Sequence, residues 1–244
     1  MKAGFRYIER GSEATFVCLQ GWGFTGDLFL HLPPPLSSSN LVIHPGLLTG
    51  SEVGWLMDFL SELQSGKMGR RLILLGWSLG ARMAAELAAA AEDLSISGCA
   101  LICFSTGYER SYMEELKSQI SKDAIRTLRN FHLKCFWGDK KGYRRFKTEL
   151  QQKILEKIDP DHLSRGLDYL SMPFAPAAGA TDRRTAHGLF VWCSRDIVAD
   201  ESQTRRWSKG PEAAAIFADI KRVRIDAPHF PFYSPHLYHE LSTL

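Results

Sequence analysis

The sequence LILLGWSLGARMAAELA (residues 72–88) decides the expected fold. It begins with a strand-like apolar run, continues through the pattern G-x-S-x-G at residues 76–80, and ends in an alanine-rich segment that favours a helix. A serine between a strand and a helix in this pattern stands on a tight turn that presents its hydroxyl as a nucleophile. Larger side chains at the two glycine positions would collide with the neighbouring strand and helix. We therefore expect Ser78 to be a nucleophile, the alternative being an idle serine on a glycine-rich turn.

The rest of the chain alternates between strand-like and helix-like segments. Such alternation is typical of an α/β fold whose mostly parallel sheet has helices on both faces. Expected strands are residues 14–19, 41–43, 71–75, 97–104, 188–193 and 222–225, with a possible edge strand at 5–9. Expected helices are residues 52–64, 81–91, 202–217 and 235–244, the third with a break at Gly210-Pro211.

The alternation stops between residues 106 and 184, where the pattern is mostly helical. This stretch lies between two expected strands, so it belongs at the carboxyl edge of the sheet, where open α/β sheets bind ligands. We interpret it as a helical lid over a core built from residues 1–105 and 185–244. The alternative is an ordinary set of packing helices.

Composition excludes several classes of protein. The 244 residues carry a net charge of +3, too small to indicate nucleic-acid binding by itself, and no apolar run approaches the length of a membrane span. Residues 1–7 lack the apolar stretch of a signal peptide. Five cysteines form an odd number without metal-type spacing, which favours buried free thiols in a reducing compartment. We expect a cytoplasmic protein that binds neither a membrane nor a metal.

A nucleophilic serine needs a base, and the base needs an acid that orients it. In a fold of this kind the chain order is serine, acid, histidine, each on a loop after a strand. Asp196 follows the strand at 188–193, whereas Asp200 is better placed to cap the next helix. His229 follows the last strand, while the other histidines fall in the C-terminal helix pattern or precede Asp196. We predict that Asp196 orients His229 and that His229 is the base.

The negative charge that develops on the substrate needs backbone N–H donors. One donor is expected from Leu79, directly after the nucleophile. The other is expected from Trp22, in the glycine-flanked turn that follows the first long strand, and its indole would also form a wall of the acyl pocket. A glycine turn that carries a core tryptophan is the alternative.

Together these residues resemble the α/β-hydrolase fold, and more narrowly the carboxylesterases of biotin synthesis that cleave pimeloyl-[acyl-carrier protein] methyl ester. The likeness is specific at GWG (21–23), at GWSLG (76–80) and at the C-terminal histidine loop, which continues into Ser234-Pro235 and a helix. It is looser at residues 126–131 and 163–170. The chain departs from the family pattern with Gln20, His44 and Ala81 where histidine, aspartate and glycine are common.

The resemblance implies a nucleophile, an acid and a base at Ser78, Asp196 and His229, with no cofactor. It also implies contacts between Trp22 or Leu79 and the substrate carbonyl. Further contacts with the acyl group would come from lid residues, namely Phe131, His132, Leu133, Lys134 and Cys135.

The lid segment from Arg126 to Lys147 contains eight basic residues and only one acidic residue. This net charge of +7 favours an acidic partner such as an acyl-carrier protein, which Arg126, Arg129, Lys140, Lys141, Arg144 and Arg145 would contact. The alternative is a solvated basic helix face that binds no partner. The leading functional hypothesis is a serine carboxylesterase acting on the methyl ester of pimeloyl-[acyl-carrier protein]. The alternative is a thioesterase or small-ester esterase that needs no carrier protein.

Overall fold

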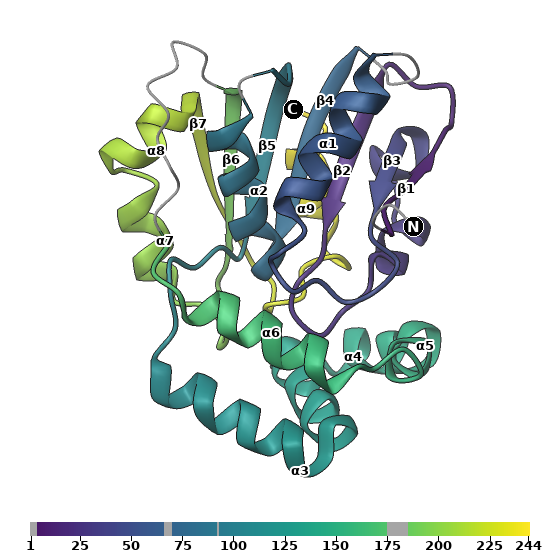
Figure 1. The fold of residues 1–244 in the computed structure, drawn as a ribbon, viewed down its shortest axis with the longest axis vertical. Coiled ribbons are helices and arrows are strands. Elements are labelled where there is room, and N and C mark those ends of the chain that lie inside the picture. Colours follow the sequence, from purple (N-terminus) through teal and green to yellow (C-terminus); the bar gives the residue numbers. More distant parts are fainter. Residues whose placement is uncertain (1–3, 66–69, 92, 175–184) are drawn as a thin grey trace.

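A computed structural model describes residues 4–65, 70–91, 93–174 and 185–244. Within them seven strands form one sheet in the order β1-β3-β2-β4-β5-β6-β7 (Figure 1). Only the edge strand β1 runs antiparallel to its neighbour. The strands are β1 (Arg6–Ile8), β2 (Ala14–Leu19), β3 (Asn40–Ile43), β4 (Arg71–Trp77), β5 (Ile96–Ile102), β6 (Thr185–Cys193) and β7 (Phe217–Ile225). The predicted parallel α/β sheet is confirmed.

Helices flank the sheet on both faces. Figure 1 shows α1 and α2 in front of the strands and α9 behind them. The helices around the sheet are α1 (Val53–Gln64), α2 (Leu79–Ala90), α7 (Glu201–Trp207), α8 (Pro211–Ile216) and α9 (Pro235–Leu241), with short 3-10 turns η1 (Gly26–His31) and η2 (Leu36–Ser38). None of the helices in the described part of the chain is long and apolar enough to cross a membrane.

The element boundaries differ from the sequence prediction mainly at β7. The predicted helix at 202–217 breaks at Gly210-Pro211, as expected, but the strand after it begins at Phe217 rather than Arg222. Pairing with β6 extends from Thr185↔Phe217 to Cys193↔Ile225, so sheet hydrogen bonds hold these residues extended. At the other boundary, β5 ends at Ile102 because Cys103 adopts a positive φ of 49° and turns the chain out of the sheet.

The central strands are apolar on both faces, as buried parallel strands require. In β4 the residues from Leu72 to Trp77 are all buried. The carboxyl ends of the neighbouring strands are in register. Leu19 pairs with Gly76, Trp77 pairs with Ile102, and Ile102 pairs with Val191. The loops after β2, β4, β5 and β6 therefore emerge side by side at one edge of the sheet.

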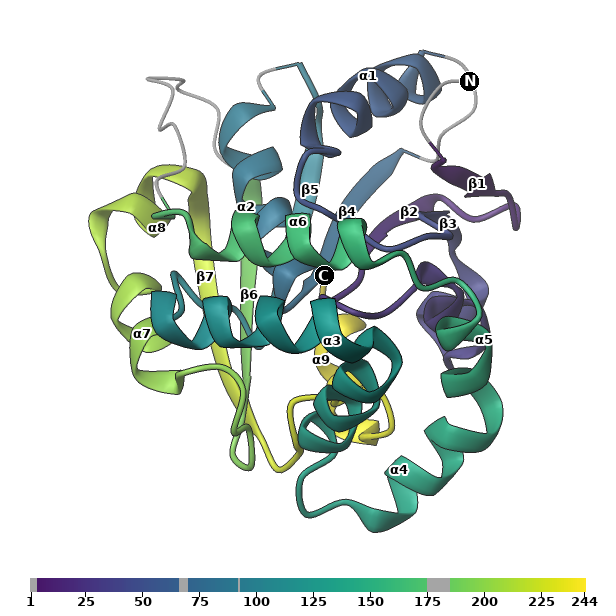
Figure 2. The ribbon, with the colours of Figure 1, turned by 60° about the horizontal axis from the view of Figure 1, so that its bottom comes forward.

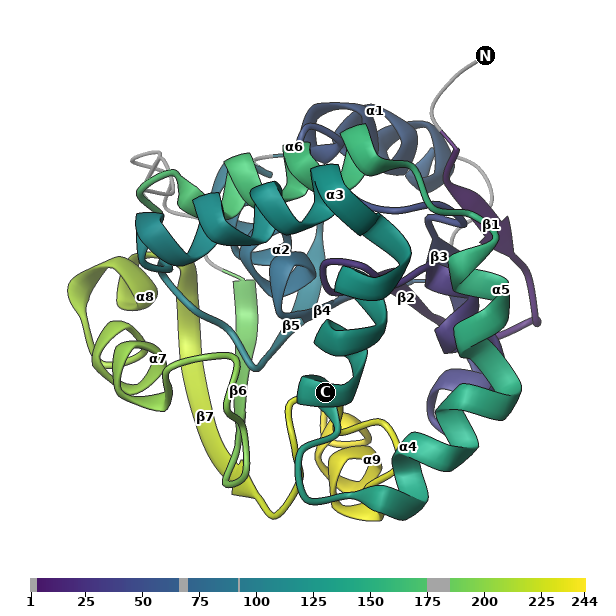
Figure 3. The ribbon, with the colours of Figure 1, turned by 90° about the horizontal axis from the view of Figure 1, so that it is seen from below.

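Between β5 and β6 the chain forms a group of helices that we call the insertion helices. They are α3 (Arg110–Cys135), α4 (Lys140–Phe146), the π-turn η3 (Lys147–Gln151), α5 (Gln152–Leu155) and α6 (Pro160–Ser171). Figures 1, 2 and 3 place them across the carboxyl ends of the parallel strands, where the sequence predicted an insertion. Within α3, Asp123 has non-helical angles (φ −159°, ψ 90°), so the helix changes direction there.

A buried arginine ties α6 to the sheet layer. The side chain of Arg82 on α2 is 3% exposed and donates to the carbonyl oxygens of Leu170 and Met172. It also lies over the ring of Tyr169, 4.6 Å from its centroid, and pairs with Glu86 at 3.3 Å. The Tyr169 hydroxyl donates to the other oxygen of Glu86, so this closed network fixes the insertion over the strand ends.

Candidate active site

Ser78 stands alone between β4 and α2 in a backbone conformation that L-residues rarely adopt (φ 55°, ψ −114°). Its N–H donates to the Ile102 carbonyl of the neighbouring strand at 2.9 Å. A Cβ at Gly76 would lie 2.3 Å from the Gly80 carbonyl oxygen, and one at Gly80 would lie 2.1 Å from the Leu19 carbonyl oxygen. The glycines are therefore required by close backbone contact on both sides of the serine, as the sequence predicted.

The structure pairs His229 with Asp196 and not with Asp200. His229 Nδ1 lies 2.7 Å from Asp196 Oδ2, and both side chains are buried. Asp196 Oδ1 accepts hydrogen bonds from the N–H groups of Val198 and Ala199 at 2.7 and 2.9 Å. Asp200 instead caps α7 by accepting from the Ser202 N–H, as expected.

These contacts keep the Asp196 carboxylate charged. Burial alone would raise the pKa of Asp196, but the His229 imidazole and the N–H groups of Ala199 and Val198 outweigh burial and lower the pKa below its usual value. An ionised carboxylate accepts the Nδ1 proton of His229 and leaves Nε2 with its lone pair. His229 Nε2 is buried and has no hydrogen-bond partner within the described residues. This free nitrogen is what a general base requires.

The backbone of His229 is held from two neighbouring strand ends. Its carbonyl oxygen accepts from the indole Nε1 of Trp77 at 2.8 Å and from the Cys103 thiol at 3.4 Å. In the sequence, Trp77 is one of the two variable positions of G-x-S-x-G, and the pattern predicts no role for it. Its position inside the motif was the available signal, but the contact joins residues 152 positions apart and is visible only in the fold.

Tyr108 is a second residue that sequence analysis missed. Burial and the nearby Asp196 carboxylate raise the pKa of Tyr108 well above its usual value, while the nearby Ser78 side chain acts in the opposite direction. The phenol therefore remains protonated at neutral pH, in the neighbourhood of Ser78 and Asp196.

The turn after β2 lies against the serine. A Cβ at Gly21 would come within 3.2 Å of Ser78 Cβ, which places the backbone of this turn beside the nucleophile. The Trp22 indole donates to the Leu163 carbonyl at 2.8 Å and meets the Phe131 ring edge-on, with centroids 4.7 Å apart. Trp22 thus joins the turn to α6 and α3, while the N–H groups of Trp22 and Leu79 stay predictions as oxyanion donors.

The five predicted lid contacts occupy different environments. Phe131 is buried against Trp22, and the buried Cys135 accepts the Phe230 N–H through its carbonyl at 2.9 Å. Leu133 and Lys134 are exposed on the outer side of α3, the former by 51%.

His132 forms hydrogen bonds inside the protein through both ring nitrogens. Nε2 lies 2.9 Å from the Gly23 carbonyl and Nδ1 lies 3.3 Å from Gln151 Nε2. Burial lowers the pKa of His132 to about 4, so the ring is neutral and links α3 to the turn after β2.

The six basic residues predicted to contact a carrier protein are all exposed. Five of them make no ion pair with an acidic side chain in the described part of the chain, namely Arg126, Arg129, Lys140, Lys141 and Arg144. Arg145 differs, because its Nε pairs with Glu149 at 3.0 Å and its guanidinium lies over the ring of Tyr233. The basic side chains that have no ion pair among the described residues therefore lie on α3 and α4.

The five cysteines are free and buried, as predicted. Cys103, Asp196 and His229 offer ligand atoms within 4.8 Å of one another. Burial and the neighbouring Cys193 raise the pKa of the Cys103 thiol, so it stays protonated, and the imidazole and carboxylate are bonded to each other. The group is a hydrogen-bonded assembly around His229.

Comparison with known proteins agrees with this architecture. The model of the alpha/beta hydrolase family matches residues 10–241. No curated protein matches the chain in sequence. A hydrolase from Pseudomonas aeruginosa superposes with a TM-score of 0.74 at 17% identity, covering 98% of this chain and 92% of that one.

Two further structures are similar at low identity. An esterase from Exiguobacterium antarcticum has a TM-score of 0.74 at 14% identity, covering 98% of this chain and 92% of its own. The enol-lactonase from Burkholderia xenovorans has a TM-score of 0.72 at 16% identity, covering 98% and 94%. At such identities the likeness shows the fold alone. The match of the family model over nearly the whole chain, on a sheet of the expected topology, shows that this chain belongs to the alpha/beta hydrolase family.

Proposed function

We propose that the protein is a serine carboxylesterase in which Ser78, His229 and Asp196 form the catalytic triad. The observation that carries the proposal is the buried His229 ring, whose Nδ1 is bonded to Asp196 and whose Nε2 has no partner among the described residues. This ring lies at the same sheet edge as a serine held at positive φ. A neutral imidazole in this tautomer is able to take the serine proton.

The chemistry follows the ordinary course of acyl transfer. Ser78 Oγ adds to the ester carbonyl carbon as His229 Nε2 takes its proton, and the oxyanion accepts hydrogen bonds from the N–H groups of Leu79 and Trp22. The C–O bond then breaks, and His229 returns the proton to the departing alcohol, which is methanol for a methyl ester. Water, deprotonated by His229, cleaves the acyl-enzyme and releases the carboxylate.

Within this class we propose the methyl ester of pimeloyl-[acyl-carrier protein] as substrate, with residues 106–184 as a lid and the cytoplasm as the site of reaction. The support is the resemblance of the GWG and GWSLG turns together with the exposed basic residues on α3 and α4. A basic surface at the mouth of a site attracts an acidic carrier and raises the encounter rate.

Replacement of the nucleophile tests the reaction class. Ser78→Ala should abolish hydrolysis of a p-nitrophenyl ester and labelling by a fluorophosphonate, while the circular dichroism spectrum stays that of the wild type. An Ala variant that hydrolyses the ester at the wild-type rate would disprove the triad. An unlabelled wild-type serine would instead indicate a binding protein on a hydrolase fold.

Charge reversal tests the carrier protein separately. Lys141→Glu/Arg144→Glu should lower kcat/KM for the carrier-bound ester and leave turnover of the free methyl ester unchanged. Arg206→Glu/Lys209→Glu, an equal charge change in α7 and the turn after it, is the matched control. Equal turnover of the carrier-bound ester by both double variants would favour the alternative, a thioesterase or small-ester esterase. Rescue of a biotin auxotroph that lacks its esterase tests the substrate in a cell.

A further inference from the structure

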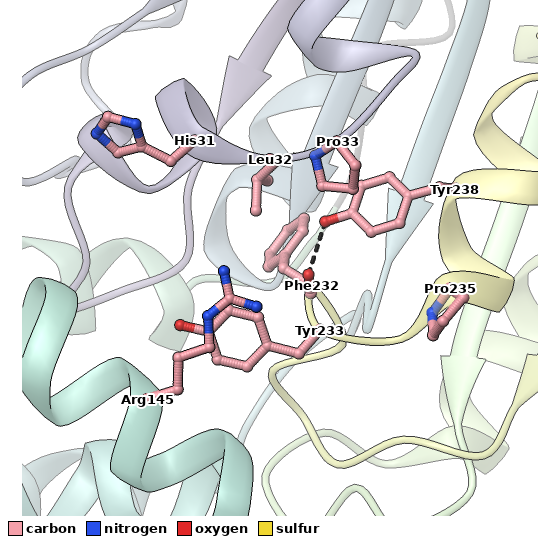
Figure 4. A pocket seen from close by; sticks show the side chains of 8 residues that line it. All are labelled: His31, Leu32, Pro33, Arg145, Phe232, Tyr233, Pro235 and Tyr238. Carbon is pink, nitrogen blue, oxygen red and sulfur yellow. Dashed lines mark hydrogen bonds between the residues drawn. The ribbon is translucent and has the colours of Figure 1, made fainter.

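A hollow lies on the far side of the aromatic residues that follow His229. It is bounded by η1, by α4 with η3, and by the segment that leads into α9 (Figure 4). Two adjoining cavities of about 290 and 420 Å³ share the same four lining residues, His31, Leu32, Arg145 and Tyr233. Neither cavity is lined by Ser78, Asp196 or His229.

Packed rings separate this pocket from the candidate active site. The Phe230 ring lies edge-on to Trp77, with centroids 5.3 Å apart, and stacks on Phe136 at 4.6 Å. Phe230 lines the pocket on one side, while the carbonyl of the preceding residue is fixed by the indole of Trp77 on the other. A molecule in the pocket is therefore divided from the catalytic groups by a layer of buried side chains.

The pocket contains two polar groups whose hydrogen-bonding capacity is unused. Arg145 bonds Glu149 through Nε alone, and its terminal nitrogens have no hydrogen-bond partner in the described part of the protein. Figure 4 shows the guanidinium over the Tyr233 ring, 4.4 Å from its centroid, with one terminal nitrogen directed toward Leu32. The Tyr233 hydroxyl is buried and likewise has no partner among the described residues.

Both groups offer protons at neutral pH. Burial and the nearby Glu149 carboxylate raise the pKa of Tyr233 to about 12, so its hydroxyl is a donor, and arginine has donors only. Lys153 adds a second cation at the wall. Because Glu149 already neutralises part of the charge of Arg145, the set suits a single negative charge better than a phosphate dianion.

The remaining walls are apolar. Leu28, Leu32 and Phe232 are almost wholly buried where they border the cavities. A hydrogen bond from the Tyr238 hydroxyl to the Phe232 carbonyl at 2.6 Å fixes this wall, as Figure 4 shows. An apolar hollow with a few convergent donors is the usual form of a small-molecule site.

We propose that this pocket binds a small carboxylate with an apolar body, its carboxylate held by Arg145 and the Tyr233 hydroxyl. The fork of an arginine matches the two oxygens of a carboxylate, and such charge-assisted bonds are the strongest a surface pocket can offer. Octanoate is a suitable probe, and octanol is its uncharged counterpart of the same length.

Titration calorimetry with octanoate tests the site. Arg145→Gln should weaken binding at least about tenfold because it removes a charged donor, and Tyr233→Phe should weaken it less, since it removes only a hydroxyl. Arg144→Gln is the matched control, because this exposed neighbour does not line the pocket. Octanol should bind more weakly than octanoate. On leucine-methyl-labelled enzyme, octanoate should shift the resonances of Leu28 and Leu32.

Several results would overturn the site. One is that octanoate does not bind, and another is that Arg145→Gln binds it as tightly as the wild type. A third is that octanol binds as tightly as octanoate, and a fourth is that the methyl shifts are confined to Leu79 beside the serine. If Arg145→Gln fails to fold, Thr148→Trp serves instead, since it fills the pocket from an exposed position with Arg145 intact. Undiminished octanoate binding by that variant would equally refute the proposal.

Discussion

The backbone strain at Ser78 can be measured by exchanging alanine for glycine. A residue other than glycine at such angles costs of order 1–3 kcal/mol, whereas glycine adopts them freely. At an ordinary buried position the exchange of alanine for glycine destabilises the fold. It loses about 0.8 kcal/mol for the buried methyl group and about 0.5–1 kcal/mol for added backbone entropy. At residue 78 the relief of strain opposes both losses.

Ala81 provides the matched reference, because it is fully buried on the first turn of α2, three residues along the chain. Ala81→Gly should lower the free energy of unfolding by about 1.5 kcal/mol. Ser78→Gly should instead exceed Ser78→Ala in stability by about 0.5 kcal/mol, because about 2 kcal/mol of strain relief opposes the same loss of about 1.5 kcal/mol. Urea denaturation of Ser78→Ala, Ser78→Gly and Ala81→Gly measures both steps, and the thermal midpoints should shift by about 2–4 °C per kcal/mol.

Backbone strain at Ser78 is refuted if the exchange of alanine for glycine destabilises the protein as much at residue 78 as at residue 81. The positive φ of Ser78 would then cost no free energy, although Gly76 and Gly80 still lie against backbone. Both Ser78 variants lack the hydroxyl, so the comparison is independent of catalysis.

Three other perturbations follow from buried contacts. Trp77→Phe removes the indole donor to the His229 carbonyl, and kcat for a p-nitrophenyl ester should fall about tenfold with little change in KM; an unchanged kcat would refute the positioning role. Arg82→Leu leaves the carbonyl of Met172 without a donor and should lower the free energy of unfolding by about 3 kcal/mol, measured in urea. Burial raises the pKa of the Cys99 thiol, so this thiol keeps its proton in the folded state. As pH rises above the thiol pKa of the unfolded chain, the unfolded state loses that proton and the free energy of unfolding falls. From pH 8 to 9.5, under reductant, wild type should lose about 1.2 kcal/mol more than Cys99→Ala.

Those parts of the site that depend on local sequence could be predicted. Ser78 was recognisable because two glycines and a strand-to-helix change surround it, and each glycine proves to lie against backbone. Asp196 was distinguishable from Asp200 because only one of them directly follows a strand, while the other precedes a helix that needs a cap. Such signals are contained within a few residues of the chain.

Contacts between distant segments could not be predicted in this way. His132 was expected to line an acyl site, but a lone histidine on a helix gives no sign that Gly23 and Gln151 will occupy its ring nitrogens. Arg144 and Arg145 are adjacent and chemically identical in sequence, yet only the second is paired and stacked. Successive residues leave a helix in different directions. Which of those directions meets another segment of the chain is decided by tertiary packing.

The sheet order explains why His229 is held so completely. Strands β4, β5 and β6 are neighbours, and from the end of each comes one group that reaches this histidine: the Trp77 indole, the Cys103 thiol and, just beyond β6, the Asp196 carboxylate. Two of these groups bind the carbonyl and one binds the ring. Rotation of the imidazole would break the bond to a buried carboxylate, and displacement of the backbone would leave a buried carbonyl without donors. Among the described residues nothing occupies the lone pair of Nε2, which takes the serine proton in the proposed reaction.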